Sequence, residues 1–165
     1  MAEENYQFDD FFANLNDEYK DFVTTIHEMV QENGFDKIAI GSSKVNLFTV
    51  KYTNKKTRRG IVNLTLRRKS FAVTVLAANN DKYPELLNKM PEQMANQIEK
   101  VHTCKNISEP GQCMDKCVGY EFHVRDRHFQ KCKFGCFKFT VDAENMPYLL
   151  ELIKTELEMR KFAAK

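Results

Sequence analysis

The sequence predicts an α+β fold in a single domain spanning residues 1–165, with helices packed on one face of an antiparallel β-meander. A cysteine-bearing β-hairpin and a final helix are expected to follow the meander. Two patterns predict this fold: apolar residues recur at helical spacing near both ends of the chain, and they alternate with polar residues between positions 37 and 77. With 165 residues, 42% of them hydrophobic, the chain is long enough to form one core.

The first 34 residues predict amphipathic helix. Apolar side chains recur every three or four positions from Phe8 to Val30, and Gly34 is a typical residue to follow a helix end. Asn16 and Asp17 can cap a second helix, so we expect the run to be split there.

Four strands are expected next, at residues 37–41, 45–52, 61–66 and 71–77. Polar and basic turns separate them at 54–60 and 67–70, and the alternation predicts a sheet with one buried face. Pro84 and Pro91 are expected to begin short helices, and a last helix is expected from Pro147 to about Arg160.

Residues 118–141 predict a β-hairpin. Apolar residues alternate on both arms, but the alternation changes parity beside Gly135, which predicts a β-bulge there. A three-residue loop at 126–128 would pair Phe122 with Cys132, Tyr120 with Phe134 and Val118 with Cys136. This register is preferred because it gives one apolar face and sets no aromatic residue opposite lysine.

All five cysteines lie between positions 104 and 136. Two pairs separated by a hairpin predict a structural zinc site of four thiolates, formed by Cys113, Cys117, Cys132 and Cys136, with Cys104 as an alternative ligand. Three residues within each pair, where two are usual, argue against it. The alternatives are a disulfide or redox role, for example Cys117 with Cys136, small buried thiols, and an iron–sulfur cluster. His102, His123 or His128 would be able to replace one zinc ligand.

Charge is distributed unevenly along the chain. Residues 1–36 hold ten acidic residues and one base, whereas residues 37–80 hold ten bases and no acid. The basic segment predicts a surface for nucleic acid or another anionic ligand; alternatively, the acidic segment packs beside it and neutralises its field. The anion-binding candidates are Lys51, Lys55, Lys56, Arg58, Arg59, Arg67, Arg68 and Lys69.

The sequence favours a binding or accessory domain over an enzyme. It contains no phosphate-binding glycine loop, dinucleotide fingerprint, nucleophile elbow or metalloprotease helix motif. No segment is apolar enough to cross a membrane, and the acidic first ten residues do not resemble a signal peptide, so a cytoplasmic location is expected. The alternative function is a thiol-dependent enzyme or redox protein that uses a cysteine of residues 113–136. The oligomeric state is not predicted.

Residues 8–19, the helix ending at Gly34–Phe35 and the strand Lys37–Gly41 resemble the YdhG-type domains of bacteria. The resemblance covers about the first 80 residues by pattern. It implies a small α+β domain with helices against an antiparallel sheet, and it supplies no catalytic residue. The cysteine-bearing hairpin departs from that group.

Overall fold

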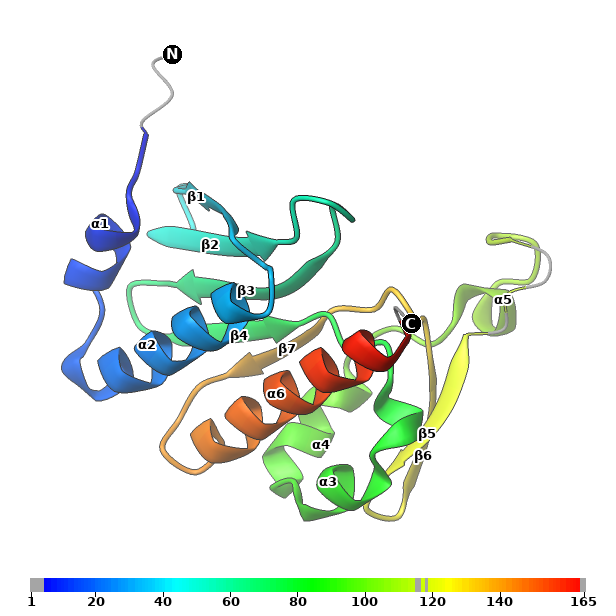
Figure 1. The fold of residues 1–165 in the computed structure, drawn as a ribbon. Coiled ribbons are helices and arrows are strands. Elements are labelled where there is room, and N and C mark those ends of the chain that lie inside the picture. The colour runs from blue at the N-terminus through cyan, green and yellow to red at the C-terminus, as the bar shows by residue number, and fades with distance from the viewer. Residues whose placement is uncertain (1–4, 115–116, 118, 164–165) are drawn as a thin grey trace.

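The computed structural model describes residues 5–114, 117 and 119–163. Its main element is a five-stranded antiparallel sheet with the strand order β1-β2-β3-β4-β7 (Figure 1). A separate two-stranded hairpin, β5–β6, lies beyond one edge of it. The strands are β1 (Lys37–Gly41), β2 (Phe48–Thr53), β3 (Gly60–Leu66), β4 (Phe71–Val75), β5 (Tyr120–Val124), β6 (Arg127–Lys131) and β7 (Phe137–Thr140).

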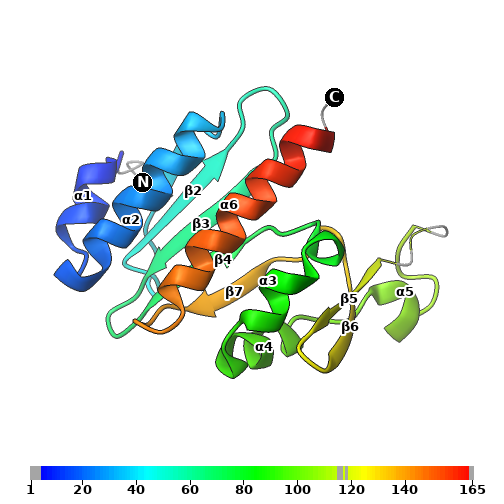
Figure 2. The ribbon, with the colours of Figure 1, turned by 60° about the horizontal axis from the view of Figure 1, so that its bottom comes forward.

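Two long helices lie side by side on the same face of the five-stranded sheet, as both ribbon views show (Figures 1 and 2). These are α2 (Asp17–Glu32) and α6 (Met146–Ala163). The expected α+β class is therefore confirmed. The shorter helices are α1 (Phe8–Ala13), the 3-10 turn η1 (Asn80–Lys82), α3 (Pro84–Lys89), α4 (Glu92–Glu99) and α5 (Lys105–Ser108).

The two predicted signals of the first helical segment are confirmed. Asn16 is the residue before the first turn of α2, so the segment is split there. Gly34 follows the end of α2 with a φ of +85°, a conformation that costs glycine little because it has no Cβ.

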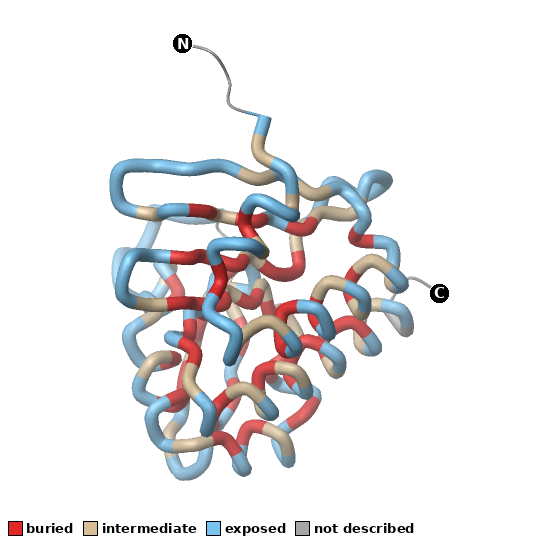
Figure 3. The backbone as a smooth tube through the Cα atoms, turned by 90° about the vertical axis from the view of Figure 1, so that its left-hand side faces the viewer, coloured by how far each residue is buried: buried red, intermediate tan, exposed pale blue. Residues whose placement is uncertain are grey.

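The core lies between the sheet and the two long helices. Val50, Leu64, Val73 and Phe139 are direct cross-strand partners on four neighbouring strands, and all are 0% exposed. Figure 3 shows buried stretches of chain on both the strands and the helices. The alternation within the strands therefore puts one continuous apolar face under α2 and α6.

The predicted hairpin over residues 118–141 is wrong in its second arm. The chain turns at Arg125 and Asp126, where Arg125 has a φ of +56°, and β6 ends at Lys131. Strand β7 then leaves the hairpin and pairs with β4 of the main sheet. The change of parity beside Gly135 thus marks the passage of the chain from one sheet to the other, and not a bulge within one strand.

The predicted register and its three-residue loop are also wrong. Phe122 lies opposite Phe129, and Tyr120 lies opposite Lys131. The predicted partner of Cys136, Val118, is outside the described residues. The expected register excluded an aromatic residue opposite lysine, and the structure contains such a pair.

Lys131 can occupy this apolar face because its long side chain reaches polar partners. Lys131 is 3% exposed, and its Nζ donates to the carbonyl of Glu99 at 3.2 Å and to the carbonyl of Val101. One carbonyl belongs to the last residue of α4 and the other lies just after the helix, where helix geometry leaves acceptors unpaired. The methylene chain is buried while the ammonium group is hydrogen-bonded, so the lysine anchors β6 to α4.

A buried polar network fixes α6 to the chain that follows β4. The carboxylate of Glu156, 0% exposed, accepts hydrogen bonds from the Ala78 N–H and Asn79 Nδ2, both at 2.9 Å, and from Arg160 Nε at 3.2 Å. The hydroxyl of Tyr83 lies 3.0 Å from its second oxygen. Burial, and then the neighbouring carboxylate, raise the pKa of Tyr83 far above its ordinary value, so this hydroxyl remains neutral.

The same network reaches the hairpin through Tyr120. Its hydroxyl donates to the Ala77 carbonyl at 2.9 Å and accepts from Asn80 Nδ2 at 2.9 Å. Asn80 Oδ1 in turn lies 2.7 Å from the Tyr83 hydroxyl. One connected set of buried hydrogen bonds therefore joins the sheet, α6 and β5.

Candidate functional site

The face of the five-stranded sheet opposite α2 and α6 is polar, and we refer to it as the open face. The two ribbon views show both long helices on the other side (Figures 1 and 2). Cross-strand pairing places a single row of side chains across all five strands of this face. The row is Ala39, Lys51, Asn63, Thr74 and Lys138.

Two lysines stand on this row among small side chains. Lys51 on β2 and Lys138 on β7 are both exposed, while Asn63 and Thr74 between them are half-buried. Three strand spacings separate the lysines, which corresponds to about 14 Å between their backbones. The next row contains only small residues: Gly41, Thr49, Thr65, Ala72 and Thr140.

The eight predicted anion-binding residues are all exposed, but the structure does not bring them into one cluster. Four lie in the β2–β3 turn (Lys55, Lys56, Arg58, Arg59), and three lie in the β3–β4 turn (Arg67, Arg68, Lys69). These turns are at opposite ends of β3, whose seven residues span about 20 Å. Only Lys51 lies on the sheet between them.

Asn54 orders the first basic turn. Its side-chain oxygen accepts the N–H groups of Lys56 and Thr57, both at 2.9 Å, and its carbonyl accepts the Arg58 N–H at 2.8 Å. This is an Asx turn, in which a short polar side chain replaces backbone partners. Lys55 forms an ion pair with Asp36 at 3.1 Å, so one of the four charges is already compensated.

Lys138 was not among the residues predicted for this face. Burial, and then the nearby positive charge of Arg67, lower the pKa of Lys138, so two cations lie close together on this face. Lys138 alternates with the buried Phe137 and Phe139, which is a signal for an exposed sheet position. The signal was not assigned to the main sheet because residues 137–141 were expected to belong to the hairpin.

Negative charge is located on the other side of the sheet. The strand residues of the open face include no aspartate or glutamate among the described positions. The exposed acids of α2 lie on the helix layer instead: Asp17, Glu18, Asp21, Glu28 and Glu32. The acids of α2 therefore do not cover the open face, although Asp36 pairs with Lys55 at the end of the sheet.

We call residues 103–136 the cysteine arm. Its described thiols differ in exposure: Cys104 is buried, Cys117 and Cys132 are half-buried, and Cys113 and Cys136 are exposed. All five are free thiols, and no three His, Cys, Asp or Glu side chains in the described part of the chain are arranged to hold a metal ion. The zinc site expected at Cys113, Cys117, Cys132 and Cys136 thus remains a prediction.

Three of the cysteine-bearing segments nevertheless lie against one another. The Cys104 N–H donates to the carbonyl of Gln130 at 3.2 Å, which joins the start of the arm to β6. Gly119 has a φ of +69°, and a Cβ at this position would lie 3.2 Å from Cys104 Sγ and 2.4 Å from the Lys131 carbonyl. Only glycine allows such a close approach of three chain segments.

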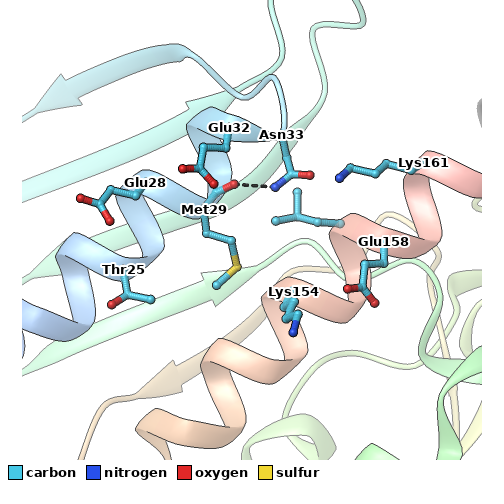
Figure 4. Close-up of a pocket in the computed structure, with 9 residues that line it drawn as sticks. Thr25, Glu28, Met29, Glu32, Asn33, Lys154, Glu158 and Lys161 are labelled. Carbon is cyan, nitrogen blue, oxygen red and sulfur yellow. Dashed lines mark hydrogen bonds between the residues drawn. The ribbon is translucent and has the colours of Figure 1, made fainter.

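A groove lies between the two long helices. It has a volume of about 430 Å³, and Figure 4 shows side chains from both helices around it. Glu28, Glu32 and Glu158 contribute carboxylates, and Lys154 and Lys161 contribute ammonium groups. Both signs of charge are mixed and no nucleophilic thiol or histidine is among the described residues that line the groove, so it favours no particular chemistry.

The side chain of His27 on α2 contacts both α1 and the sheet. Its Nδ1 lies 2.8 Å from the Tyr52 hydroxyl, and the Phe8 ring stacks on the imidazole at 4.0 Å between centroids. Burial lowers the pKa of His27, although the charge of Glu28 opposes this effect. The histidine therefore fixes α1 to the sheet in its neutral form.

No protein-family model, curated protein or solved structure matches this chain. No helix in the described residues has the length and apolar character to span a membrane.

Proposed function

We propose that the open face of the sheet binds the phosphate backbone of a nucleic acid, independently of base sequence. The observation that carries this proposal is the row from Ala39 to Lys138, which crosses five strands and holds two exposed lysines. Phosphate binding requires exposed positive charge in small, polar surroundings, and it does not require a motif.

The aromatic residues of the sheet argue for backbone contacts over base stacking. Phe48, Tyr52, Phe71, Phe137 and Phe139 all belong to the buried face. The open face therefore has no aromatic platform on its described strand residues, and base stacking is the usual way to bind unpaired bases. The basic turns at the two ends of β3 extend the positive surface along the strand direction.

The test is the affinity for a fluorescent duplex and a single-stranded oligonucleotide, measured by anisotropy at several salt concentrations. We expect affinity to fall steeply with salt, because each neutralised phosphate releases counterions. Lys51→Gln/Lys138→Gln should weaken binding of all sequences alike. It should also reduce the salt slope by about two, because each lysine that neutralises a phosphate adds roughly one to that slope.

The matched control removes two positive charges elsewhere. Lys89→Gln/Lys100→Gln changes the net charge equally, but both residues are exposed at the C-terminal ends of α3 and α4. Equal decreases of affinity in the two double variants would show that only net charge matters and would contradict the proposal. Binding that does not depend on salt would contradict it as well.

The alternative of a thiol-dependent enzyme or redox protein is supported by one contact, the N–H of Phe134 at 3.4 Å from Cys132 Sγ. This hydrogen bond fixes the position of the Cys132 sulfur at the turn. The test is the alkylation rate of each cysteine at mildly acidic pH. A half-buried Cys132 that reacts no faster than the exposed Cys113 and Cys136 would remove this alternative.

A further inference from the structure

We propose that Arg67, Lys138 and Thr65 form a binding site for a single phosphate group at the β3–β4 end of the open face. The inference rests on the proposed function, because it fixes one phosphate position within the same surface. It goes further by selecting one arginine from the basic turns and by adding a buried hydroxyl as a third donor. The ligand is a phosphate group, carried either within the backbone of a nucleic acid or at its end.

The three residues surround Ala72 on the open side of the sheet. Thr65 on β3 is the direct cross-strand partner of Ala72 on β4, and β7, which carries Lys138, pairs with the other side of β4. Arg67 follows Thr65 by two positions. Its N–H donates to the Ser70 carbonyl at 2.8 Å, so strand-like pairing continues into the turn. Because side chains alternate along a strand, Arg67 and Thr65 face the same side.

Asn46 orients the Arg67 side chain without neutralising it. Asn46 Oδ1 accepts a hydrogen bond from Arg67 Nε at 3.0 Å, and the Asn46 N–H donates to Ser43 Oγ at 3.0 Å. Among the described residues, Arg67 has no carboxylate partner, and neither of its Nη groups is hydrogen-bonded. A guanidinium whose two Nη groups are available matches the oxygens of a phosphate, and its prior orientation reduces the entropy lost on binding.

Lys138 provides a second positive charge close to the first. Burial, and then the positive charge of Arg67, lower the pKa of Lys138, so the two cations interact across the surface. No aspartate or glutamate in the described part of the chain forms an ion pair with either of them. Neighbouring cations repel each other, and an anion bound between them would relieve this repulsion. The pair therefore favours a negatively charged ligand.

Thr65 contributes a hydroxyl at the base of the site. Its side chain is only 6% exposed, and its hydroxyl forms no hydrogen bond with the residues that the structure describes. Most buried polar side-chain atoms have a partner, so this hydroxyl is available to a ligand. The neighbouring Ala72 presents only a methyl group, so no large side chain covers the hydroxyl from that strand. One phosphate oxygen can accept the hydroxyl proton while the two cations bind the others.

The first experiment titrates inorganic phosphate into the isotope-labelled full-length protein at constant ionic strength and follows the backbone amide resonances. We expect saturable shifts confined to the surroundings of Thr65, Arg67 and Lys138. Arg67→Gln should raise the dissociation constant about tenfold or more, because it removes charge-assisted hydrogen bonds. Thr65→Val keeps the shape of the side chain and suits a strand, and it should raise the constant about fivefold.

Asn46→Ala separates orientation from charge. It leaves every positive charge in place and keeps both hydrogen bonds between the Asn46 backbone and Ser43, so net charge alone predicts no change. We expect binding to weaken about threefold, because the guanidinium is no longer held in position. Lys100→Gln removes an exposed charge at the end of α4 and should bind phosphate like the native protein. Affinity that falls no more in Arg67→Gln than in Lys100→Gln, or shifts spread over both basic turns, would overturn the proposal.

The second experiment compares duplexes of one sequence with and without terminal phosphates in the anisotropy assay. Tighter binding of the phosphorylated duplex that is lost in Arg67→Gln would assign the site to a terminal phosphate. Equal binding that weakens in Arg67→Gln would assign it to an internal phosphodiester. A localised inorganic-phosphate site without nucleic-acid binding would support the site and contradict the proposed function. Nucleic-acid binding that weakens in Lys51→Gln/Lys138→Gln but not in Arg67→Gln would overturn the site and support the proposed function.

Discussion

The sheet body, formed by residues 8–77 and 137–161, and the cysteine arm are held together by different forces. In the sheet body, direct cross-strand partners such as Val50, Leu64 and Val73 are completely buried under two helices. In the cysteine arm, the hairpin buries Phe122 and Val124, but Ile107, Met114 and Phe134 outside it are exposed, and many contacts of the arm are polar. Lys131 and Asn106 are examples, since both bind backbone carbonyls.

This difference shows why the two regions need different supports. Apolar burial contributes roughly 25 cal/mol for each Å² removed from water, so a continuous face under two helices stabilises the sheet body by itself. Within the described part of the arm, only the hairpin β5–β6 has this support, because Phe122 and Val124 are buried in the same core. The rest of the arm leaves Ile107, Met114 and Phe134 at least 46% exposed, and segments with little buried apolar surface are commonly stabilised by metal ions or disulfides. Substitutions in the sheet body, in the arm and in the hydrogen bonds that connect them should therefore change the stability of the protein by different amounts.

The largest effect is expected at Glu156, a residue of the sheet body that binds the chain leading toward the arm. Glu156→Ala would leave Arg160 without its carboxylate and would leave the half-buried Ala78 N–H and Asn79 amide without this acceptor. We expect a decrease of about 3–5 kcal/mol in the free energy of unfolding, measured by urea denaturation. Glu156→Gln keeps the shape and part of the hydrogen bonding, so its decrease should be smaller. Equal decreases would show that the packing of the side chain, and not its hydrogen bonds, is what matters.

An effect confined to acidic pH is expected at His27, in the sheet body. Because burial lowers the pKa of His27 in the folded protein, the unfolded chain binds the proton more readily. This contribution to stability is complete above about pH 6.5, the ordinary histidine value, and declines as pH falls toward the lower folded pKa. His27→Gln should flatten this part of the stability curve, measured by thermal unfolding at a series of pH values. Parallel curves for the two proteins would contradict it.

The sheet body was predicted from the sequence more fully than the arm, for a physical reason. In the body, the spacing of apolar residues indicates directly which side of each element is buried. The division of the first helical segment at Asn16, the end of α2 before Gly34 and the final helix were predicted in this way. In the arm, alternation is equally clear in β5 and β7, but it identifies a strand without naming its partner. Residues 137–140 were therefore expected to complete a local hairpin, whereas they complete the main sheet.

The candidate sites show the same limit. The excess of bases in residues 37–80 was visible, but Lys138 joins Lys51 only through the pairing of β7 with β4. Similarly, cysteine spacing groups Cys113 with Cys117, while the contact of Cys104 with Gly119 depends on tertiary structure. The resemblance of the first 80 residues to the YdhG-type domains stays a prediction.

The smallest effect is expected at the far end of the arm, where Arg127 joins the hairpin to α4. Its guanidinium donates to Asn96 Oδ1 at 2.6 Å and lies 3.3 Å from the carboxylates of Glu92 and Glu99. Both glutamates are at least 65% exposed, so water and salt screen these pairs. Arg127→Ala should therefore cost less than about 1 kcal/mol in global unfolding. Hydrogen exchange should nevertheless increase in β5 and β6 and stay unchanged in β2, β3 and β4, because a separate arm opens locally before the sheet body does. Faster exchange throughout the main sheet would show instead that the hairpin and the sheet body unfold as one cooperative unit.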